Sequence, residues 1–530
     1  MSHRPGRAAR RRATGVLAAM LVAATGLPAH AAAAAAAPGE CGTDRTCLTA
    51  RQLDQVRSDP ARLQEFLSEF PKGGDLHNHL SGAIATESLI GYAAEDGRCI
   101  DTTTLAASPG PCRTGQRPAS DAVSDPQFRD QVLRAWSMEG FDPSGPESGH
   151  DHFFATFGKF GAATEGRTGD MLAGITRDAA RDHLSYVETM YGLQGSARWD
   201  LVQRVGFPPH HEQDFAELRR RLLPGMREIA AAAQRDNDAA FARRRDLLHC
   251  GSAAAEPACG VRLAHNFQVG REAPPEQVFG SLLLGFELAQ RDSRTVGLNM
   301  VQPEDGEISL RDYTLQMRMV GFLRHLYPQV HVTLHAGELV PGLVKPEDLS
   351  FHIREAVDIA EVDRVGHAVD LEHETGWQAL AERMRRRGVL VESPLTSNCQ
   401  ILRACGPGEH PLPTYLRHGV PVALATDDPG VSRSSITADY RHAVESFGLT
   451  YPQLVDSARE SLEHAFLPGP SLWAGSVGED LVLPCAGEAP GARPPSTACE
   501  AYLEHSPKAA TQWDHEAALQ HFESTHTTRS

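Results

Sequence analysis

The chain has 530 residues, of which 41% are hydrophobic and 22% charged, and these ordinary globular values exclude a disordered chain as the default. Its formal net charge of −17 argues against binding to nucleic acid backbones or anionic membranes, because both carry negative charge. A small neutral or cationic ligand is more compatible with this charge. The length allows about two or three domains, or one large barrel with insertions.

The first 31 residues have the features of a secretory signal peptide. Five arginines between Arg4 and Arg12 precede an apolar stretch at 13–27, and Ala29, His30 and Ala31 form an A-x-A cleavage site. Cleavage removes five positive charges and no acidic residue, so the net charge becomes −22. No later apolar run approaches the length that crosses a bilayer. We therefore expect a secreted, extracellular protein without membrane contact after cleavage. The general secretory route is favoured, with twin-arginine export as the alternative.

Ten cysteines in an exported chain predict five disulfide bonds. The cysteines occur in close sequential couples, and local pairing has the lowest entropic cost of loop closure. The predicted couples are Cys41 with Cys47, Cys99 with Cys112, Cys250 with Cys259, Cys399 with Cys405, and Cys485 with Cys499. A cysteine metal site is the alternative, and no C-x-x-C spacing supports it.

Residues 32–70 form a predicted N-terminal helical segment, with one helix over 48–70 that ends at Pro71. A strand at 74–79 and a helix at 85–94 follow. The stretch 99–124 is rich in Pro, Gly, Ser and Thr, which predicts a disulfide-stapled surface loop. Aromatic residues at helical spacing over 151–160 predict an amphipathic helix, which either packs in the core or covers a pocket.

From residue 71 to about residue 470 the pattern alternates strands with helices. The predicted strands are 74–79, 184–191, 261–269, 295–301, 330–335, 364–369, 389–393 and 420–426, with helices such as 214–234, 275–289, 310–326 and 353–360 between them. Eight such units predict an α/β fold, a (β/α)8 TIM-type barrel with disulfide-stapled loop insertions. Residues 471–530 form a C-terminal extension with a helix and a polar tail. In such barrels the chemistry gathers at the C-terminal ends of the strands.

Polar side chains follow the ends of four predicted strands. His77 and His79 alternate along the first strand and so point to one side of it. The other groups are His335 and Glu338 after the fifth strand, His367 after the sixth, and Asp427 and Asp428 after the eighth. Each group alone fits a core histidine, a capping aspartate or a solvated glutamate. Together, on one face of a barrel, they indicate a functional site.

These residue types suit a mononuclear hydrolytic metal centre. Three histidine nitrogens and one aspartate oxygen bind Zn²⁺ and leave a position for a water, whose pKa then falls towards 7. A further histidine can deprotonate that water, and a carboxylic acid can protonate the substrate. We therefore expect one zinc ion per chain.

Over residues 68–470 these motifs, in this order, resemble the adenosine deaminase family, including its secreted members. The runs 351–358, 364–367 and 461–466 are similar as well. The resemblance implies a purine nucleoside substrate, with adenosine converted to inosine and ammonia. It also implies zinc binding by His77, His79, His335 and Asp427, proton donation to purine N1 by Glu338, positioning and deprotonation of the water by His367, and contacts of Asp428 with the water and N7.

Two positions depart from the family pattern. Ser81 stands where the family commonly has an aspartate that contacts the ribose, and Gln302 stands where it usually has a glycine beneath the purine. Both positions are therefore candidate substrate-binding residues. The departures leave open a modified adenine nucleoside or a nucleotide as the substrate.

Three other functions are alternatives. A binuclear amidohydrolase often carries a carboxylated lysine at the end of the fourth strand, and 295–302 contains no lysine. Cytidine-type zinc deaminases need H-x-E with P-C-x-x-C, and the second motif is absent. A catalytically silent binding protein would have lost a ligand or the Glu338 and His367 pair, and none is lost. The sequence does not indicate an oligomeric state.

Overall fold

A computed structural model describes residues 41–206 and 214–528. It divides into two compact units, Met1–Thr43 and Asp44–Ser530, and the second unit contains the fold described below. The predicted signal peptide and its cleavage site lie outside the described residues. Within the described ranges, no helix has both the length and the apolar character needed to cross a membrane.

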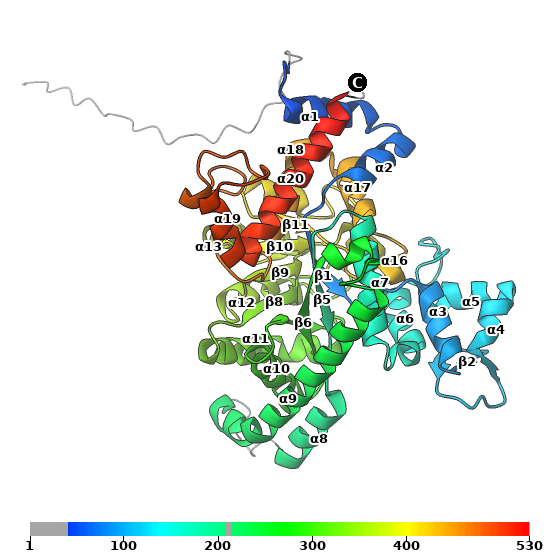
Figure 1. The fold of residues 1–530 in the computed structure, drawn as a ribbon. Helices are drawn as coiled ribbons and strands as arrows, with labels where there is room; N and C mark the ends of the chain where they lie inside the picture. The colour runs from blue at the N-terminus through cyan, green and yellow to red at the C-terminus, as the bar shows by residue number, and fades with distance from the viewer. Residues whose placement is uncertain (1–40, 207–213, 529–530) are drawn as a thin grey trace, which may run out of the picture. The chain divides into compact units, whose positions relative to one another are not determined.

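The centre of the second unit is a barrel of eight parallel strands with helices around it (Figure 1). The strands are paired in chain order, and a bridge between Asn78 and Asp427 joins the first strand to the end of the last. The backbone N–H of His79 donates to Asp427 O at 2.9 Å, and the Asp427 N–H donates to His77 O at 2.8 Å. The strands are β1 (Gly74–His79), β5 (Tyr186–Tyr191), β6 (Arg262–Gly270), β7 (Thr295–Val301), β8 (His331–Ala336), β9 (Arg364–His367), β10 (Leu390–Ser393) and β11 (Val422–Leu424). The predicted (β/α)8 barrel is therefore confirmed.

Helices connect successive strands and cover the outside of the barrel. They are α7 (Thr168–Arg181), α9 (Phe215–Leu247), α10 (Pro275–Ala289), α11 (Glu307–Leu326), α12 (His352–Asp358), α13 (Trp377–Arg387), α15 (Leu412–Arg417), α17 (Ile436–Phe447) and α18 (Tyr451–Glu463), with shorter or inserted helices α3 (Thr86–Glu95), α5 (Pro126–Trp136), α6 (Gly149–Thr164), α8 (Gly195–Val205), α14 (Leu395–Leu402) and α16 (Pro429–Ser432). The predicted helix over 151–160 is α6, whose Phe153 and Phe160 are buried in the core.

The predicted single helix over 48–70 is wrong, because the structure has two helices there. They are α1 (Arg45–Val56) and α2 (Pro60–Glu69). Asp59 caps α2 by accepting the backbone N–H groups of Ala61 and Arg62, and Pro60 occupies its first turn. Proline has no N–H to continue a preceding helix, so the chain starts a new helix at this point.

The predicted insertion over 99–124 is stapled by the Cys99–Cys112 disulfide as expected, but it contains strands and a helix where the sequence predicted a loop. Strands β2 (Cys99–Asp101), β3 (Ala107–Ser108) and β4 (Gln116–Pro118) form an antiparallel sheet in the order β3-β2-β4, followed by helix α4 (Ala119–Ser124). Strands of two or three residues are too short to show the alternating pattern that identifies a strand in sequence. The buried side chain of Ile100 holds this sheet against the core.

Helix α9 continues for thirteen residues beyond the predicted end at 234. The residues that follow residue 234 are polar, which suggested exposure to solvent, but Asn237 is fully buried. Its amide nitrogen donates to Asp292 Oδ2 at 3.1 Å, and its oxygen accepts from the Tyr191 hydroxyl at 2.7 Å. Because its hydrogen bonds are made inside the protein, the polar side chain of Asn237 can be buried. Helix α9 therefore continues where the polarity of the sequence predicted its end.

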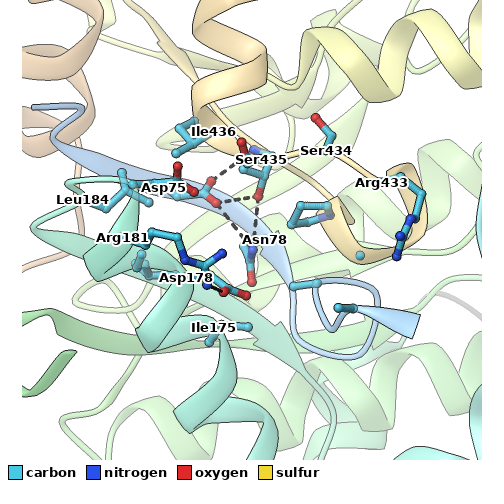
Figure 2. A pocket seen from close by; sticks show the side chains of 18 residues that line it. Asp75, Asn78, Ile175, Asp178, Arg181, Leu184, Arg433, Ser434, Ser435 and Ile436 are labelled. Atoms are coloured by element: carbon cyan, nitrogen blue, oxygen red, sulfur yellow. Dashed lines mark hydrogen bonds and ion pairs between the residues drawn. The ribbon is translucent and has the colours of Figure 1, made fainter. Parts of the chain in front are cut away.

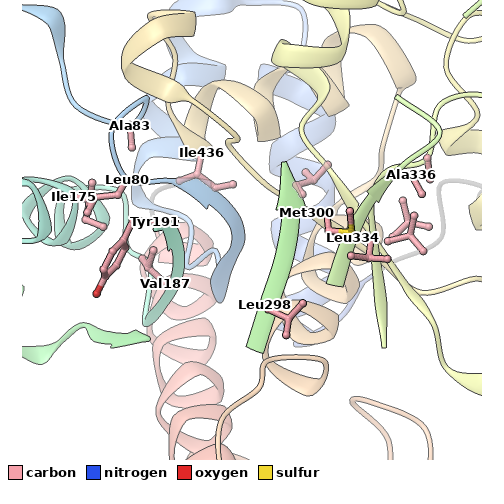
Figure 3. Close-up of a cluster of buried hydrophobic side chains, with 14 of the residues drawn as sticks. Leu80, Ala83, Ile175, Val187, Tyr191, Leu298, Met300, Leu334, Ala336 and Ile436 are labelled. Atoms are coloured by element: carbon pink, nitrogen blue, oxygen red, sulfur yellow. The ribbon is translucent and has the colours of Figure 1, made fainter. Parts of the chain in front are cut away.

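The core has an apolar outer part and a partly ionic interior. Side chains on the outer faces of the strands, such as Val187, Leu298 and Leu334, pack beneath the helices (Figure 3). Inside the barrel Arg364 is fully buried between two carboxylates. Its Nε donates to Glu392 Oε1 at 2.6 Å and its Nη2 to Glu188 Oε2 at 2.5 Å. This pairing satisfies charges that would otherwise be costly to bury.

Four of the five predicted disulfide bonds are present. They join Cys99 to Cys112, Cys250 to Cys259, Cys399 to Cys405, and Cys485 to Cys499. Among the described residues no cysteine is free, and the pairing of Cys41 with Cys47 stays a prediction.

The C-terminal extension contains helices α19 (Thr497–His505) and α20 (Pro507–Thr528). It has a small apolar core of its own, which includes Leu472, Trp473 and Trp513 and encloses the Cys485–Cys499 disulfide. Helix α20 packs against α1 and α18, so the two ends of the second unit meet on one side of the barrel (Figure 1).

Candidate active site

Three histidines and one aspartate from opposite sides of the barrel meet at the C-terminal rim. His77 and His79 come from β1, His335 from β8, and Asp427 follows β11. The Nε2 atom of His335 lies 3.1 Å from His77 Nε2 and 3.2 Å from His79 Nε2. Asp427 Oδ1 lies 3.5 Å from His77 Nε2 and 3.2 Å from His79 Nε2. All four side chains are buried, so their donor atoms face one another in a small common space.

The protonation of two of these histidines follows from their outer hydrogen bonds. His77 Nδ1 lies 2.7 Å from the carboxylate oxygen Oε2 of Glu392, to which it must donate. Asn299 Oδ1 accepts the backbone N–H of His335 at 3.0 Å, so this atom is an oxygen and His335 Nδ1 also donates to it, at 2.9 Å. Burial lowers the pKa of His335 well below its usual range, so this ring is neutral, has only one N–H and carries a lone pair on Nε2. Burial acts to lower the pKa of His77 as well, but its hydrogen bonds with Asp427 and Glu392 outweigh burial and raise the pKa to about 10.

Without a metal, a proton on His77 Nε2 fills the 3.1 Å gap to the lone pair of His335 Nε2, and a metal ion bound by both nitrogens would replace that proton. The donor set of imidazole nitrogens and one carboxylate suits a divalent transition metal. Two groups of donor atoms have the spacing of a metal site, with all atoms of a group within 4.8 Å of one another. One contains His77, His335, His367 and Asp427, and the other contains His79, Asp427 and Asp428. The residues therefore fit a metal ion.

Glu338 lies beside this group and is held by a second glutamate. Glu338 is buried, and burial together with the charge of Asp427 raises its pKa well above the usual range. The two oxygens of Glu304 accept the backbone N–H groups of Gly337 (3.0 Å) and Glu338 (2.8 Å). Glu304 Oε1 also lies 2.5 Å from His352 Nδ1. Burial acts to raise the pKa of Glu304, but the hydrogen bond and charge of His352, the charge of Arg271 and the backbone N–H of Gly337 together outweigh burial and lower the pKa.

Asp428 presents an unpaired oxygen to the site. Its Oδ1 is buried and has no hydrogen-bond partner within the described part of the chain. Burial and the neighbouring charge of Asp427 raise the pKa of Asp428 well above its usual range. The carboxyl lies against Gly82, where an added Cβ would be 1.6 Å from Oδ1. Glycine at position 82 therefore makes the space that Asp428 occupies.

His367 completes the group from β9. Its side chain is fully buried, its Nδ1 contacts the side-chain amide of Asn398 at 2.8 Å, and its Nε2 has no partner among the described atoms. Burial lowers the pKa of His367 to about 4. His367 and Asp427 both have a φ of 64°, in the left-handed region that non-glycine residues rarely adopt. Strained backbone of this kind gathers at functional sites, where it aims side chains.

A polar contact on the outer side of β1 links the two strand ends that carry ligands. Asp75 Oδ2 accepts the Thr426 hydroxyl at 2.5 Å, and Asn78 Nδ2 donates to the same hydroxyl oxygen at 3.1 Å. These side chains line a cavity of about 280 Å³, which Asp178 and Ser435 also line (Figure 2). Because Thr426 precedes Asp427 directly, this contact fixes the end of β11 against β1.

Comparisons with known proteins agree with this geometry. The family model for adenosine deaminase matches residues 232–472. Residues 232–472 therefore resemble the adenosine deaminase family, over just under half of the chain. The match includes His335, Glu338, His367, Asp427 and Asp428, while His77 and His79 lie before it and reach the same rim through the fold.

Two curated adenosine deaminases resemble part of the chain. The one from Salmonella heidelberg is 36% identical over 137 residues, and the one from Escherichia coli O1:K1 is 35% identical over 137 residues. Each alignment covers 26% of this chain and 38% of the relative, so the chain spans well under half the length of these adenosine deaminases. A solved structure from Arabidopsis, ADAL complexed with IMP, shares 18% identity at a TM-score of 0.50, covering 76% of this chain and 94% of the other. This likeness supports the barrel fold.

The two residues that depart from the adenosine deaminase family pattern lie at the rim. Ser81 is half-buried and directly precedes Gly82. Gln302 directly follows β7, is exposed, and has a φ of 85°. Its Oε1 accepts the backbone N–H of Glu272 at 2.9 Å, so the side chain is tied to the loop after β6. The left-handed φ is one that glycine adopts without strain, as expected where the family has glycine.

Sequence reasoning missed the residues that hold the predicted ones. Glu304, Asn299, Glu392 and Asn398 each contact a predicted site residue or its backbone, and all four are buried. Glu392 lies within β10, directly after apolar residues. A charged residue inside such a strand was the one sign of these supporting residues in the sequence. An asparagine or glutamate at a strand end is otherwise common, and only the fold brings these side chains behind the histidines.

Proposed function

We propose that the mature protein is a secreted, zinc-dependent hydrolytic deaminase that converts adenosine, or a related 6-aminopurine nucleoside, to inosine and ammonia. The observation that carries this proposal is the convergence of Nε2 of His77 and His335, 3.1 Å apart, with Asp427 Oδ1 3.5 Å from His77 Nε2. The match of residues 232–472 to the adenosine deaminase family supports it.

His77, His79, His335 and Asp427 would hold one zinc ion. When bound, zinc lowers the pKa of a coordinated water towards 7 and supplies the hydrolytic nucleophile. Glu392 and Asn299 orient the two histidines by accepting their Nδ1–H groups, and outer hydrogen bonds of this kind fix the ring and its tautomer.

Glu338 would act as the general acid. Burial and the charge of Asp427 raise the pKa of Glu338 and so favour the protonated carboxyl, which can donate to purine N1. Protonation at N1 makes C6 more electrophilic, so that the water oxygen adds to C6. One proton of the water leaves with the 6-amino group as ammonia, and the other replaces the proton that Glu338 gave to N1. Glu304 fixes the backbone on which Glu338 stands and thereby its position.

Asp428 and His367 would bind purine N7 and the hydrolytic water. The raised pKa of Asp428 leaves its carboxyl able to donate a hydrogen bond to purine N7 while its second oxygen contacts the water. His367 presents Nε2 to the same space and would position the water. These two residues and Glu338 come from three different strand ends, which fixes their relative positions through the barrel.

Ser81 and Gln302 favour a substrate that departs from adenosine in its sugar or purine substituent. An aspartate at position 81 would accept a charged hydrogen bond from a ribose hydroxyl, worth about 1.5–3 kcal/mol, whereas serine is shorter and neutral. A modified adenine nucleoside or a nucleotide is therefore the second candidate. The net charge of −17 disfavours nucleic acids and anionic membranes as partners and is more compatible with a neutral nucleoside than with a nucleotide.

An ammonia-release screen of the purified mature protein tests the proposal. The compounds are adenosine, deoxyadenosine, adenine, AMP and an N6-substituted adenosine, and the His335→Ala protein serves as the blank for contaminating deaminases. We expect release from at least one nucleoside in the parent and none in the blank. Release from no compound by a metal-loaded, folded protein would contradict the proposal.

A further inference from the structure

Behind His367 lies a chain of buried side chains that ends on a backbone amide. The structure places Asn398 Oδ1 2.8 Å from His367 Nδ1 and Asn398 Nδ2 2.9 Å from His410 Nε2. The backbone N–H of Leu412 then donates to His410 Nδ1 at 3.1 Å. The three side chains are at most 2% exposed, so no solvent competes for these contacts.

The backbone amide of Leu412 fixes the first proton of this chain. A backbone N–H can only donate, so His410 Nδ1 must accept and carries no proton. Burial lowers the pKa of His410 to about 3, so the ring is neutral near pH 7. A neutral imidazole has one N–H, and in His410 this N–H is therefore at Nε2.

The His410 proton then fixes the orientation of the Asn398 amide. Asparagine oxygen and nitrogen have nearly the same shape, and their hydrogen-bond partners decide which is which. Because His410 Nε2 donates, the Asn398 atom that faces it must accept, so the hydrogen bonds require the amide oxygen where the structure places Nδ2, which is a turn of the amide by 180°. The amide NH₂ consequently faces His367 and donates to His367 Nδ1. Nδ1 of His367 thus carries no proton, and in the neutral ring the N–H is at Nε2.

The same reasoning gives the opposite result for His335. Its own backbone N–H donates to Asn299 and marks that amide atom as the oxygen, so His335 carries its proton on Nδ1 and a lone pair on Nε2. Two asparagines therefore set two histidines of one site in opposite tautomers. A nitrogen that bears a proton cannot coordinate a metal, which separates His367 from His335 although both belong to the group of closely spaced donors.

We propose that Asn398 and His410 are positioning residues that hold His367 with its proton on Nε2. His367 then donates a hydrogen bond from Nε2 to the oxygen of the hydrolytic water and of the oxyanion that develops at C6. It does not accept the proton of that water in the resting protein. This inference rests on the proposed function for the group that accepts the hydrogen bond, the oxygen of the hydrolytic water. The position of the proton on His367 does not depend on the proposed function. The Cys399–Cys405 disulfide lies in the segment between Asn398 and His410 and restrains the chain.

Neutron diffraction from deuterium-exchanged crystals of the metal-loaded parent locates these protons directly. We expect a deuteron on Nε2 of both His367 and His410, none on either Nδ1, and the ND₂ group of Asn398 facing His367. A deuteron on His367 Nδ1 with a bare Nε2 would overturn the proposal. This measurement needs no variant, so a folding defect cannot obscure it.

Asn398→Asp tests this chain of hydrogen bonds by reversing the direction of the bond to His367. A carboxylate accepts from both neighbours, so the deuteron of His367 should move to Nδ1. Loss of the Nε2 donor should then lower kcat on the order of 10²-fold with the metal retained, the scale for one oxyanion donor. The matched control is Gln400→Glu, which makes the same amide-to-carboxylate change on α14 at a side chain that contacts Ser432 O. The control should stay within about threefold of the parent.

The outcomes separate this inference from the proposed function. A parent that releases no ammonia but has its deuteron on Nε2 removes the proposed function and supports the tautomer assignment. An active parent with the deuteron on Nδ1 supports the proposed function and overturns the assignment. An Asn398→Asp protein whose deuteron moves to Nδ1 while kcat stays at the parental value overturns the role as donor.

Discussion

Replacement of Gly82 by alanine probes the placement of Asp428 with a single methyl group. The added carbon would lie 1.6 Å from Asp428 Oδ1 and 2.5 Å from its Cγ. Since Cβ atoms essentially never approach other atoms within 3.0 Å, the carboxyl oxygen must move by at least about 1.4 Å. The φ of Gly82 lies outside the left-handed region, so alanine adds a steric conflict without a backbone penalty.

The expected loss follows from the contact that Asp428 makes. A displaced carboxyl leaves purine N7 without its hydrogen-bond partner in a buried site, which costs about 1–3 kcal/mol. This corresponds to a fall in kcat/KM of roughly 5- to 150-fold. The metal content should not change, because the side chain of Asp427 and the three histidines are not in conflict with the new methyl group.

The assay is ammonia release at several substrate concentrations, with metal analysis of each protein. Gly158→Ala in α6 is the matched control, because a Cβ at Gly158 meets nothing within 4 Å. Alanine in that helix should stabilise the protein by about 1 kcal/mol and leave kcat/KM unchanged. If Gly82→Ala retains kcat/KM within about threefold of the parent, Asp428 does not act from the position described.

Three further predictions concern acid catalysis, pH-dependent stability and specificity. Glu338→Gln keeps the shape of the side chain but has no acidic proton, so kcat should fall by at least on the order of 10²-fold with the metal retained; a variant within a few fold of the parent would show that Glu338 is not the acid. Burial lowers the pKa of Lys72 to about 7, so between pH 7 and 10 the unfolded chain binds more protons than the folded one and the unfolding free energy rises with pH. Urea denaturation at several pH values gives the unfolding free energy as a function of pH. Its slope should be up to about 1.4 kcal/mol per pH unit steeper in the parent than in Lys72→Met, and equal slopes would contradict the lowered pKa of Lys72 in the folded protein. The ratio of kcat/KM for adenosine to that for 5′-deoxyadenosine should be small in the parent and larger in Ser81→Asp. A parental penalty above about a hundredfold, or an unchanged ratio, would exclude Ser81 as the sugar determinant.

The barrel could be predicted because its strands are nearly continuous apolar runs between helical patterns. Strands β1 and β7 have the predicted boundaries, while β9 ends at His367 instead of residue 369. The difference arises because His367 and Ala368 both adopt positive φ, which ends the strand and has no signature in a non-glycine sequence. The division of 48–70 into two helices was readable from Asp59-Pro60, a capping residue followed by a first-turn proline.

The histidines and carboxylates of the site could be predicted because each follows a strand end in an order that resembles a known family. Their supports could not, because Glu304, Asn299 and Asn398 act through contacts between strands that are far apart in sequence. His410 lies in an irregular segment, and its role depends on one backbone amide. Contacts of this kind exist only once the chain has folded, so no local pattern encodes them.

The central claim is that His77, His79, His335 and Asp427 bind one metal ion on which activity depends. Metal analysis of the purified mature protein, made beside ammonia release on the same samples, tests it most directly. The account predicts about one equivalent of zinc in the parent, loss of both metal and activity in His335→Ala, and retention of the metal in His265→Ala, which removes a histidine equally buried outside the site. Full activity in thoroughly demetallated parent protein would contradict the account.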